Sequence, residues 1–368
     1  MKFQDHLVCQ QVTRLLQLIP SSSFSCAINM QTILSYNSIR WQRVTKLLQL
    51  IFPSPSLRVT VPVRMNASAC LAPLLTKEEH LQWAERIKPH RPHCVSVYNN
   101  LVQHGKGLVS HDTFYVLRDR PGSVMVLRKN EIIPHTQHIG IFCLKEEVSA
   151  LIETLRSSSL IDWECARRTD LLIEHVPSYA AEPLVGLMQE KGVNVQLMTF
   201  LTYIYEAHLD THTLRVPAGF RVCRLGSAGV RHLLENAKYG GIPLDLMYRM
   251  AEGVPYIGVY QDPTSAHEAT VDPENLPVAG DEEIPVAWIC SAPIGDIGMM
   301  ITDKRFRRLG FWMILTTTLA RMQAALIGFI PHAYIDMDNY ASQAAVAKSP
   351  AIMTHESNWM KKIPNLYS

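Results

Sequence analysis

Two features that would decide the class of this 368-residue chain at once are absent. There is no Cys-x-x-Cys pair, and the eight cysteines are scattered along the chain. Such spacing is typical of reduced thiols rather than of a disulfide framework. No apolar run reaches the roughly 18 residues of a membrane-spanning helix, since the longest candidate, 315–330, contains Arg321 and Gln323. We therefore expect reduced cysteines and no membrane insertion.

The chain also lacks a strong excess of either charge. With 35 Lys and Arg against 33 Asp and Glu, its net charge is +2. A nucleic-acid partner is not expected at this balance, because binding to a phosphate backbone requires a basic surface. The composition of 47% hydrophobic and 18% charged residues is that of a globular protein, and the length allows two domains.

Motifs for metal or nucleotide binding are incomplete. His90-x-x-His93-Cys94 and His135-x-x-His138 look like halves of metal sites, but no second cluster completes four ligands. Gly105-Lys106-Gly107 lacks the spacing and the Ser or Thr of a phosphate loop. We expect no metal site.

The first 66 residues differ from the rest. They contain seven Lys or Arg, many serines and a single acid, Asp5. This composition is typical of a mitochondrial transit peptide. Two other interpretations stay open. In the first, the near-duplicate segments 12–19 and 44–51 are a tandem duplication without function. In the second, translation starts at Met65. Residues 1–66 are expected to lie outside the core in every case. Without targeting, the protein would be cytoplasmic.

From residue 72 onward, strand and helix patterns alternate, which predicts an α/β layer structure. Thr76 and Glu79 form a capping box at the start of the first helix. The predicted helices cover 76–87, 144–156, 182–191, 229–238, 243–252, 310–326 and 340–347. The predicted strands cover 95–98, 113–117, 123–127, 171–176, 193–205, 220–225, 255–260, 284–290, 296–302 and 333–337. Residues 262–283 contain seven acids and no Lys or Arg, which predicts a mobile loop.

The most informative segment is Arg307-x-x-Gly310, between the strand 296–302 and the helix that begins at residue 310. The first turn of a helix leaves backbone N–H groups unpaired at the positive end of the helix dipole. Such a turn binds a pyrophosphate. Gly310 lets the backbone approach the ligand, and Arg307 and Arg308 add positive charge.

This turn, together with the element order β-α-α-β-β-β-α-β-α, is similar to the GNAT superfamily of acyl-CoA-dependent N-acyltransferases. Other motifs resemble a narrower group, the glycine N-acyltransferase family. They are Lys238-Tyr239-Gly240-Gly241, Gly295-Asp296, Ile335-Asp336-Met337-Asp338-Asn339 and, in the N-terminal half, Val97-Tyr98, His104-Gly105 and Ile161-Asp162-Trp163. The resemblance covers roughly residues 72–368.

The resemblance implies a GNAT-like mixed sheet with flanking helices, built as a tandem. A degenerate N-terminal domain at 72–210, without an Arg-x-x-Gly turn, would precede a complete GNAT domain at 216–368. The implied reaction moves an acyl group from acyl-CoA, the co-substrate, to the amine of a small acceptor such as glycine.

The resemblance also assigns the site. Asp296 takes the position of the family's catalytic carboxylate and would act as general base. A free Asp has a pKa near 3.9, so this role requires burial to raise it; the alternative is that Asp296 only ends a hairpin. The residues that would hold acyl-CoA are Met300, Ile301 and Thr302 along the pantetheine arm, Arg307, Arg308, Leu309, Gly310, Phe311 and Trp312 around the pyrophosphate, and Asn339 at the CoA amide. Met300 N–H is the candidate donor to the oxyanion.

The chain departs from the family at several positions. Trp312 stands where many GNAT proteins have a small residue, and Asp296 replaces a Glu. Two other functions stay open. A lysine acetyltransferase would use the acidic loop to receive basic peptides, and a non-catalytic acyl-CoA-binding protein would fit the changes at Trp312 and Asp296.

Overall fold

The computed structural model describes residues 71–108, 112–117, 120, 122–128, 135–206, 212–237 and 242–363. The predicted extension 1–66 and the motif Lys238-Tyr239-Gly240-Gly241 lie outside them. Residues 65–368 form one compact unit. No helix in the described part of the chain is long and apolar enough to cross a membrane.

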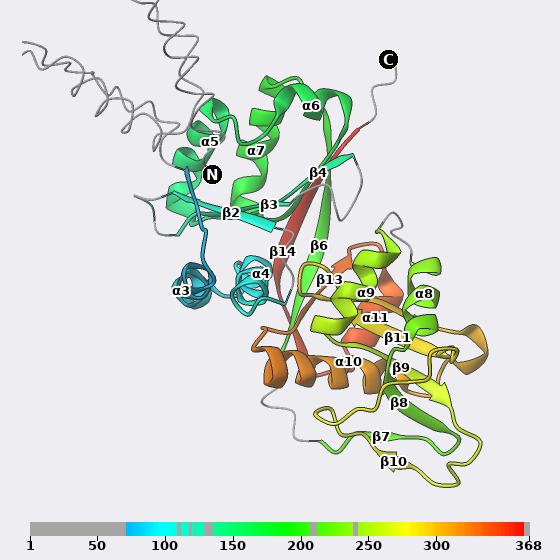
Figure 1. Cartoon of the computed structure of the whole chain (residues 1–368). Coiled ribbons are helices and arrows are strands. Elements are labelled where there is room, and N and C mark those ends of the chain that lie inside the picture. The colour runs from blue at the N-terminus through cyan, green and yellow to red at the C-terminus, as the bar shows by residue number, and fades with distance from the viewer. Residues whose placement is uncertain are drawn as a thin grey trace, which may run out of the picture. The chain divides into compact units, whose positions relative to one another are not determined.

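An eight-stranded mixed sheet is the larger of two main sheets (Figure 1). Its order is β1-β2-β3-β4-β5-β14-β6-β13. β4 and β5 are parallel, and the other neighbouring pairs in this sheet are antiparallel. The strands are β1 Leu71–Pro73, β2 Asp112–Leu117, β3 Val124–Arg128, β4 Thr136–Phe142, β5 Asp170–Pro177, β6 Val195–Tyr205, β13 His332–Asp336 and β14 Ala351–Lys362.

Helices cover both faces of this sheet. They are α3 Lys77–Ile87, α4 Val95–Gly105, α5 Val148–Ser157, α6 Trp163–Arg168 and α7 Ser178–Glu190. α5, α6 and α7 bury the apolar side chains of one face, including Ile139, Ile173 and Met360. α3 and α4 pack against the other face through Phe114 and Val126. The predicted capping box is confirmed, since Thr76 Oγ1 accepts from Glu79 N–H at 3.1 Å.

The second main sheet has four antiparallel strands in the order β12-β11-β9-β8. They are β8 Phe220–Arg224, β9 Tyr256–Gln261, β11 Ala287–Ser291 and β12 Ile297–Thr302. The accompanying helices are α8 Ser227–Glu235, α9 Leu244–Gly253, α10 Phe311–Met322 and α11 Tyr340–Val346. α10 packs on one face around Leu315 and Leu319. α8 and α9 pack on the other face, in the same core as α3 and α4.

The two predicted halves of the chain share strands as well as this core. β14, near the C-terminus, lies between β5 and β6 of the N-terminal half, and β13 pairs with the other edge of β6. Figure 1 shows β6 and β14 running together from one half to the other. The structure confirms the expected α/β fold with a large mixed sheet and flanking helices. The domain limits 72–210 and 216–368 stay a prediction.

Several predicted elements are corrected by the structure. Residues 95–98 are not a strand but the first turn of α4, whose residues are all buried. The start of α4, Val-x-Val-Tyr, alternates like a strand, and four residues are too few to separate the period of a strand from that of a helix. β4 and β14 were not predicted. The predicted long helix 310–326 ends as α10 at Met322 and continues as a π-helical turn, Gln323–Ile327.

The acidic segment 262–283 is also corrected, because it is attached to the four-stranded sheet. Arg224 N–H donates to the Pro277 carbonyl at 2.8 Å, and Ala279 N–H donates to the Arg224 carbonyl at 2.9 Å. Within the segment, the two-residue strand β10 Ala269–Thr270 pairs with β7 Arg215–Val216. These bonds replace the expected mobile loop with ordered chain.

Candidate functional site

Asp296 lies in the turn between β11 and β12, one residue before β12 begins. The turn is tight: Ala292 N–H donates to the Asp296 carbonyl at 2.9 Å, and Gly295 N–H donates to the Ala292 carbonyl at 2.8 Å. Gly295 has a φ of +80°, a conformation that glycine adopts at little cost. A Cβ at this position would lie 2.7 Å from the Cβ of Asn99. Glycine is therefore required by both conformation and space.

The carboxyl group of Asp296 is buried, with 8% of the residue exposed. Its Oδ1 has no hydrogen-bond partner among the described residues. Burial, the largest cause, and the negative charge of Glu174 together raise the pKa of Asp296 from 3.8 to about 7, against smaller lowering effects of the Asp296 backbone N–H and of Arg128. A carboxyl group with this pKa is partly ionised at neutral pH and can accept a proton there. The burial on which the predicted base depends is therefore present.

β12, which follows Asp296, is irregular where it pairs with β11. Trp288 pairs with Ile301, but Cys290 pairs with Gly298, so β12 has one extra residue between these pairs. Met299, within that bulge, has a φ of +55°. A bulge takes backbone groups out of the ladder of hydrogen bonds. The predicted oxyanion donor, Met300 N–H, lies in this bulge.

β12 is also the edge strand of its sheet, and β13 is the edge strand of the other one. The two strands are close but not paired among the described residues. Met300, Ile301 and Thr302 are partly buried. An edge strand has main-chain N–H and C=O groups available to an extended ligand.

The Arg-x-x-Gly turn lies at the other end of β12. Gly310 has a φ of +80° and immediately precedes α10. Arg307, Arg308, Leu309 and Gly310 are all exposed. Met313 N–H donates to the Gly310 carbonyl at 3.0 Å, while the first N–H groups of a helix have no acceptor within it. Four of the six residues predicted to surround a pyrophosphate, Arg307 to Gly310, are therefore together, exposed, and at the positive end of a 12-residue helix.

The next two residues of α10 have side chains in packed positions. Phe311 is 1% exposed, and its ring lies 4.9 Å from the ring of Phe220. Trp312 is partly buried against Tyr203 and Ile335 of β6 and β13. Their side chains are occupied by packing at the start of the helix. Only their backbone N–H groups could make the predicted contact with a ligand.

Asn339 has a structural role. Its Oδ1 accepts from Ser342 N–H at 3.1 Å and caps α11. Asn339 is exposed, and this capping bond uses one lone pair of its amide oxygen, so the NH₂ group and the second lone pair are left for a ligand.

The structure separates the predicted residues into two groups. Asp296 precedes β12, and the Arg307–Trp312 turn follows it. At about 3.3 Å per residue, a six-residue strand places the two groups roughly 20 Å apart. They form one site only for a long ligand that follows β12.

A buried polar cluster on the eight-stranded sheet was not found by the sequence analysis. It consists of Asp112, Arg128, His138 and Glu174. Arg128 Nε lies 3.3 Å from Asp112 Oδ1, and His138 Nε2 lies 2.5 Å from Glu174 Oε2. Burial favours a raised pKa for Glu174, but the neighbouring His138 and His175 bring the pKa well below its ordinary value. These residues come from separate strands, so no local motif announces them.

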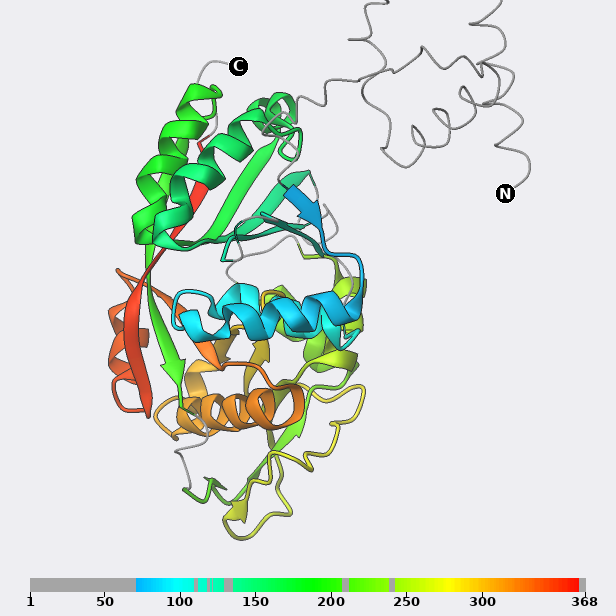
Figure 2. The same ribbon diagram turned by 90° about the vertical axis from the view of Figure 1, so that its left-hand side faces the viewer.

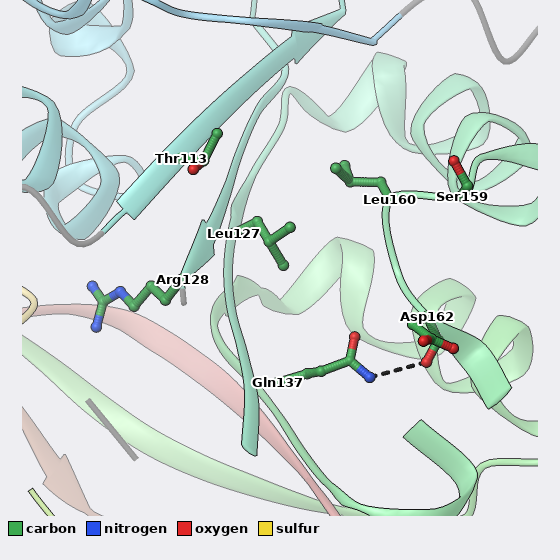
Figure 3. A pocket seen from close by; sticks show the side chains of 7 residues that line it. All are labelled: Thr113, Leu127, Arg128, Gln137, Ser159, Leu160 and Asp162. Atoms are coloured by element: carbon green, nitrogen blue, oxygen red, sulfur yellow. Dashed lines mark hydrogen bonds between the residues drawn. The ribbon is translucent and has the colours of Figure 1, made fainter. Parts of the chain in front are cut away.

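A pocket of about 380 Å³ lies on the N-terminal part of the sheet (Figure 3). It is lined by Thr113, Leu127, Arg128, Gln137, Ser159, Leu160 and Asp162. Gln137 Nε2 donates to the Asp162 carbonyl at 2.9 Å, and the Arg128 side chain points away from the other lining residues (Figure 3). None of the predicted site residues lines this pocket. Within the described ranges, no group of three or more His, Cys, Asp or Glu is placed to hold a metal ion.

A family model matches the segment of the chain that contains Asp296 and the Arg-x-x-Gly turn. Residues 278–348 match the family model described as FR47-like protein. This stretch runs from before β11 to α11 and contains Asp296 and the Arg-x-x-Gly turn. The match supports a relation to the GNAT superfamily for the part of the chain that contains the site. No curated protein matches the sequence.

A solved structure with low sequence identity shares the fold. A Drosophila protein is 17% identical, with a TM-score of 0.63 over 80% of this chain and 99% of its own. A GCN5-related N-acetyltransferase from Sphaerobacter thermophilus is 11% identical, with a TM-score of 0.47 over 79% of this chain and 95% of its own. A tandem GNAT protein from the clavulanic acid biosynthesis pathway is 12% identical, with a TM-score of 0.44 over 80% of this chain and 99% of its own.

Proposed function

We propose that the protein transfers an acyl group from acyl-CoA to the amine of a small acceptor such as glycine. The observation that carries the proposal is Asp296, a buried carboxyl group whose pKa is raised to about 7, at the start of a bulged edge strand. The FR47-like match over this segment supports the same reaction class.

The length of β12 fits a CoA thioester, in which an extended pantetheine arm joins a pyrophosphate to the reacting sulfur. The pyrophosphate would accept hydrogen bonds from the N–H groups at the start of α10, with Arg307 and Arg308 adding positive charge. The arm would follow Met300, Ile301 and Thr302, and the thioester would then lie near the bulge and Asp296. A backbone N–H in the bulge, with Met300 as the candidate, would stabilise the oxyanion.

The chemical step follows from these positions. The acceptor nitrogen attacks the thioester carbonyl carbon, a C–N bond forms, and a proton passes from the nitrogen to the Asp296 carboxylate. The tetrahedral intermediate then collapses with cleavage of the C–S bond, and CoA leaves as a thiolate that takes up a proton. A positioned base of this kind contributes about 10²–10⁴-fold to the rate.

The test uses the purified chain with acetyl-, benzoyl- and phenylacetyl-CoA, each combined with glycine, glutamine, a lysine peptide or no acceptor. Mass spectrometry would detect the acylated product, and a thiol reagent would follow CoA release. We expect an acylated small amine with an equal amount of released CoA, and a loss of about 10²–10⁴-fold in Asp296→Asn.

The other outcomes distinguish the alternatives. Acylation of the peptide alone would identify a lysine acetyltransferase. Thioesters that bind but stay intact with every acceptor would identify an acyl-CoA-binding protein. Turnover that is unchanged in Asp296→Asn would remove this residue from the mechanism but leave the reaction class.

A further inference from the structure

The helix α4 of the N-terminal half lies between the two main sheets (Figure 2). All eleven of its residues are buried, including Asn99 at 0% and Asn100 at 2% exposure. A buried amide is unfavourable unless hydrogen bonds replace the lost water. The partners of these two side chains therefore show what α4 holds in place.

Asn99 contacts the backbone at two separate points of the C-terminal half. Its Nδ2 donates to the Gly295 carbonyl at 2.9 Å and to the Ile330 carbonyl at 3.0 Å. Its Oδ1 accepts from Ile330 N–H at 2.9 Å. Gly295 directly precedes Asp296, and Ile330 lies two residues before β13. Asn99 thus joins the starts of two edge strands, β12 and β13, which are not paired with each other in the described part of the chain.

Asn100 contacts the carbonyl of Ile294, the residue before Gly295 in the β11–β12 turn. Its Nδ2 donates to the Ile294 carbonyl at 3.1 Å, and its Oδ1 accepts from Arg128 Nη2 at 2.9 Å. Consecutive residues of α4 therefore bind consecutive carbonyls, Ile294 and Gly295, immediately before Asp296. Through Arg128, this contact continues into the buried polar cluster on the eight-stranded sheet.

A third link fixes a neighbouring imidazole. His332 Nδ1 lies 2.9 Å from the Ile330 carbonyl and 3.3 Å from Asn99 Nδ2. A carbonyl oxygen only accepts hydrogen bonds, so His332 contacts the Ile330 carbonyl as the tautomer with a proton on Nδ1. The Ile330 carbonyl then accepts two hydrogen bonds, one from His332 Nδ1 and one from Asn99 Nδ2.

We propose that Asn99 and Asn100 are positioning residues for Asp296. The proposal rests on the proposed function for its catalytic consequence. The Asp296 Oδ1 has no partner of its own among the described residues, so the turn backbone fixes where the carboxyl group lies. That backbone is held from α4, which gives the N-terminal half a role in the reaction although it has no Arg-x-x-Gly turn.

The experiment compares Asn99→Ala and Asn100→Ala with a matched control, Asn358→Ala. Asn358 is 5% exposed, donates to Ser178 Oγ at 3.2 Å and accepts from Thr199 Oγ1 at 3.2 Å. Like Asn99 it is a buried amide with partners on two other elements, but it has no contact with the Asp296 turn. For each variant, Tm, the Kd of acetyl-CoA, the KM of the amine and the pH profile of kcat would be measured.

We expect kcat to fall roughly 10–100-fold in Asn99→Ala, because small displacements of a reacting group reduce rates on this scale. The fall in Asn100→Ala should be smaller, since Ile294 is one residue farther from Asp296. The acid limb of the pH profile should move in both variants, and the Kd of acetyl-CoA should change less than about twofold, because its principal contacts are at the far end of β12. Asn358→Ala should lower Tm without moving the acid limb.

Equal losses of kcat in Asn99→Ala and Asn358→Ala, with unmoved acid limbs, would overturn the proposal. If Asn99→Ala fails to fold, Asn100→Ala provides the same comparison. If the wild-type chain transfers no acyl group, the proposed function fails, but the positioning can still be measured. The free energy of unfolding would then be measured against pH for the wild type, Asn99→Ala and Asn100→Ala, each with and without Asp296→Asn. The difference that Asp296→Asn makes changes with pH, and the pH at the middle of that change reports the pKa of Asp296. The same pH in the wild type, Asn99→Ala and Asn100→Ala would show that neither asparagine positions the carboxyl group.

Discussion

Single residues in the β11–β12 turn combine conformational and electrostatic demands. Gly295 allows a left-handed backbone next to Asn99, and the enclosed carboxyl group of Asp296 has one oxygen without a partner in the described part of the chain. Burial of an ionisable group without a partner is costly. An amide at position 296 would avoid the cost of a buried charge. The stabilities of the wild type and of Asp296→Asn can therefore be compared.

Asp296→Asn should abolish most turnover yet stabilise the fold at high pH. The pKa of Asp296 is raised from 3.8 to about 7, so the native state binds more protons than the unfolded state between these values. The free energy of unfolding therefore falls as pH rises from about 4 to 7. The ionised group costs on the order of 4 kcal/mol above that range, at about 1.4 kcal/mol per pKa unit. Urea unfolding at pH 4 and pH 8 checks this: the variant's advantage should appear at pH 8 only. An equal difference at both pH values would contradict the raised pKa.

The two left-handed glycines of the site should respond differently to alanine. Gly295→Ala adds a Cβ 2.7 Å from the Asn99 Cβ, whereas no atom lies within 4 Å of a Cβ at Gly310. Gly310→Ala should therefore lower the free energy of unfolding only by the cost of a left-handed backbone for alanine, about 1–2 kcal/mol. Gly295→Ala should lose more and should reduce kcat by moving Asp296. Thermal unfolding and kcat of both variants provide the comparison, and equal losses of stability would contradict the close contact.

At the scale of elements, β12 and α10 act as one unit. The strand has a bulge near its start, at Met299, and the turn after its end has a second strained residue, Arg308, with a φ of +68°. Non-glycine residues in this region are uncommon and indicate a constraint. The constraint at Arg308 lies in the turn just before α10.

Arg308→Gly should separate stability from ligand binding. Glycine relieves the left-handed backbone, so the free energy of unfolding should rise by about 1 kcal/mol. The loss of a positive charge at the proposed pyrophosphate site should weaken CoA binding severalfold, more so at low salt. Calorimetric titration with CoA and denaturant unfolding measure the two effects. Arg305→Gly is the control, because its guanidinium pairs with Asp303 Oδ2 at 2.7 Å. Unchanged CoA affinity in Arg308→Gly would remove this residue from the site.

Element types were predicted best where the signal is local. The capping box at Thr76, the strand that follows Asp296 and the glycine before α10 depend on neighbours in sequence, and all are present. The start of α4 was mistaken for a strand because its first four residues alternate, and its burial on every side is decided by two sheets that are distant in sequence. β14 is paired with a strand on each side. It was not predicted because many of its side chains are exposed, so its sequence lacks the apolar pattern of a buried strand.

At the scale of the whole molecule, the two halves are joined by strand exchange and by a shared core. β14 separates β5 from β6, so the N-terminal half alone would have two unpaired strand edges in the middle of its sheet. Unpaired edges favour aggregation. The core that contains α3, α4, α8 and α9 likewise draws side chains from residues 72 to 330.

A fragment comprising residues 65–210 should therefore not fold alone. We expect it to aggregate or to unfold without cooperativity, and to regain a cooperative transition when mixed with residues 211–368, which supply β13 and β14. Circular dichroism with thermal unfolding of each fragment and of the mixture tests this. The intact chain, cleaved at an inserted protease site between the halves, is the control for complementation. Cooperative unfolding of residues 65–210 alone would show that the shared strands are dispensable.

The alternation of helices and strands, the capping box at Thr76 and the Arg-x-x-Gly turn before α10 can be predicted from the amino-acid order, because periodicity, capping and turn geometry depend on residues within a few positions of one another. The place of β14, the buried polar cluster and the surroundings of Asp296 depend on the folded arrangement of the chain. The raised pKa of that residue follows from enclosure and from Glu174, and its turn is held by Asn99. Burial and charge at a point in space depend on side chains that lie far away in the chain, so no local pattern contains them.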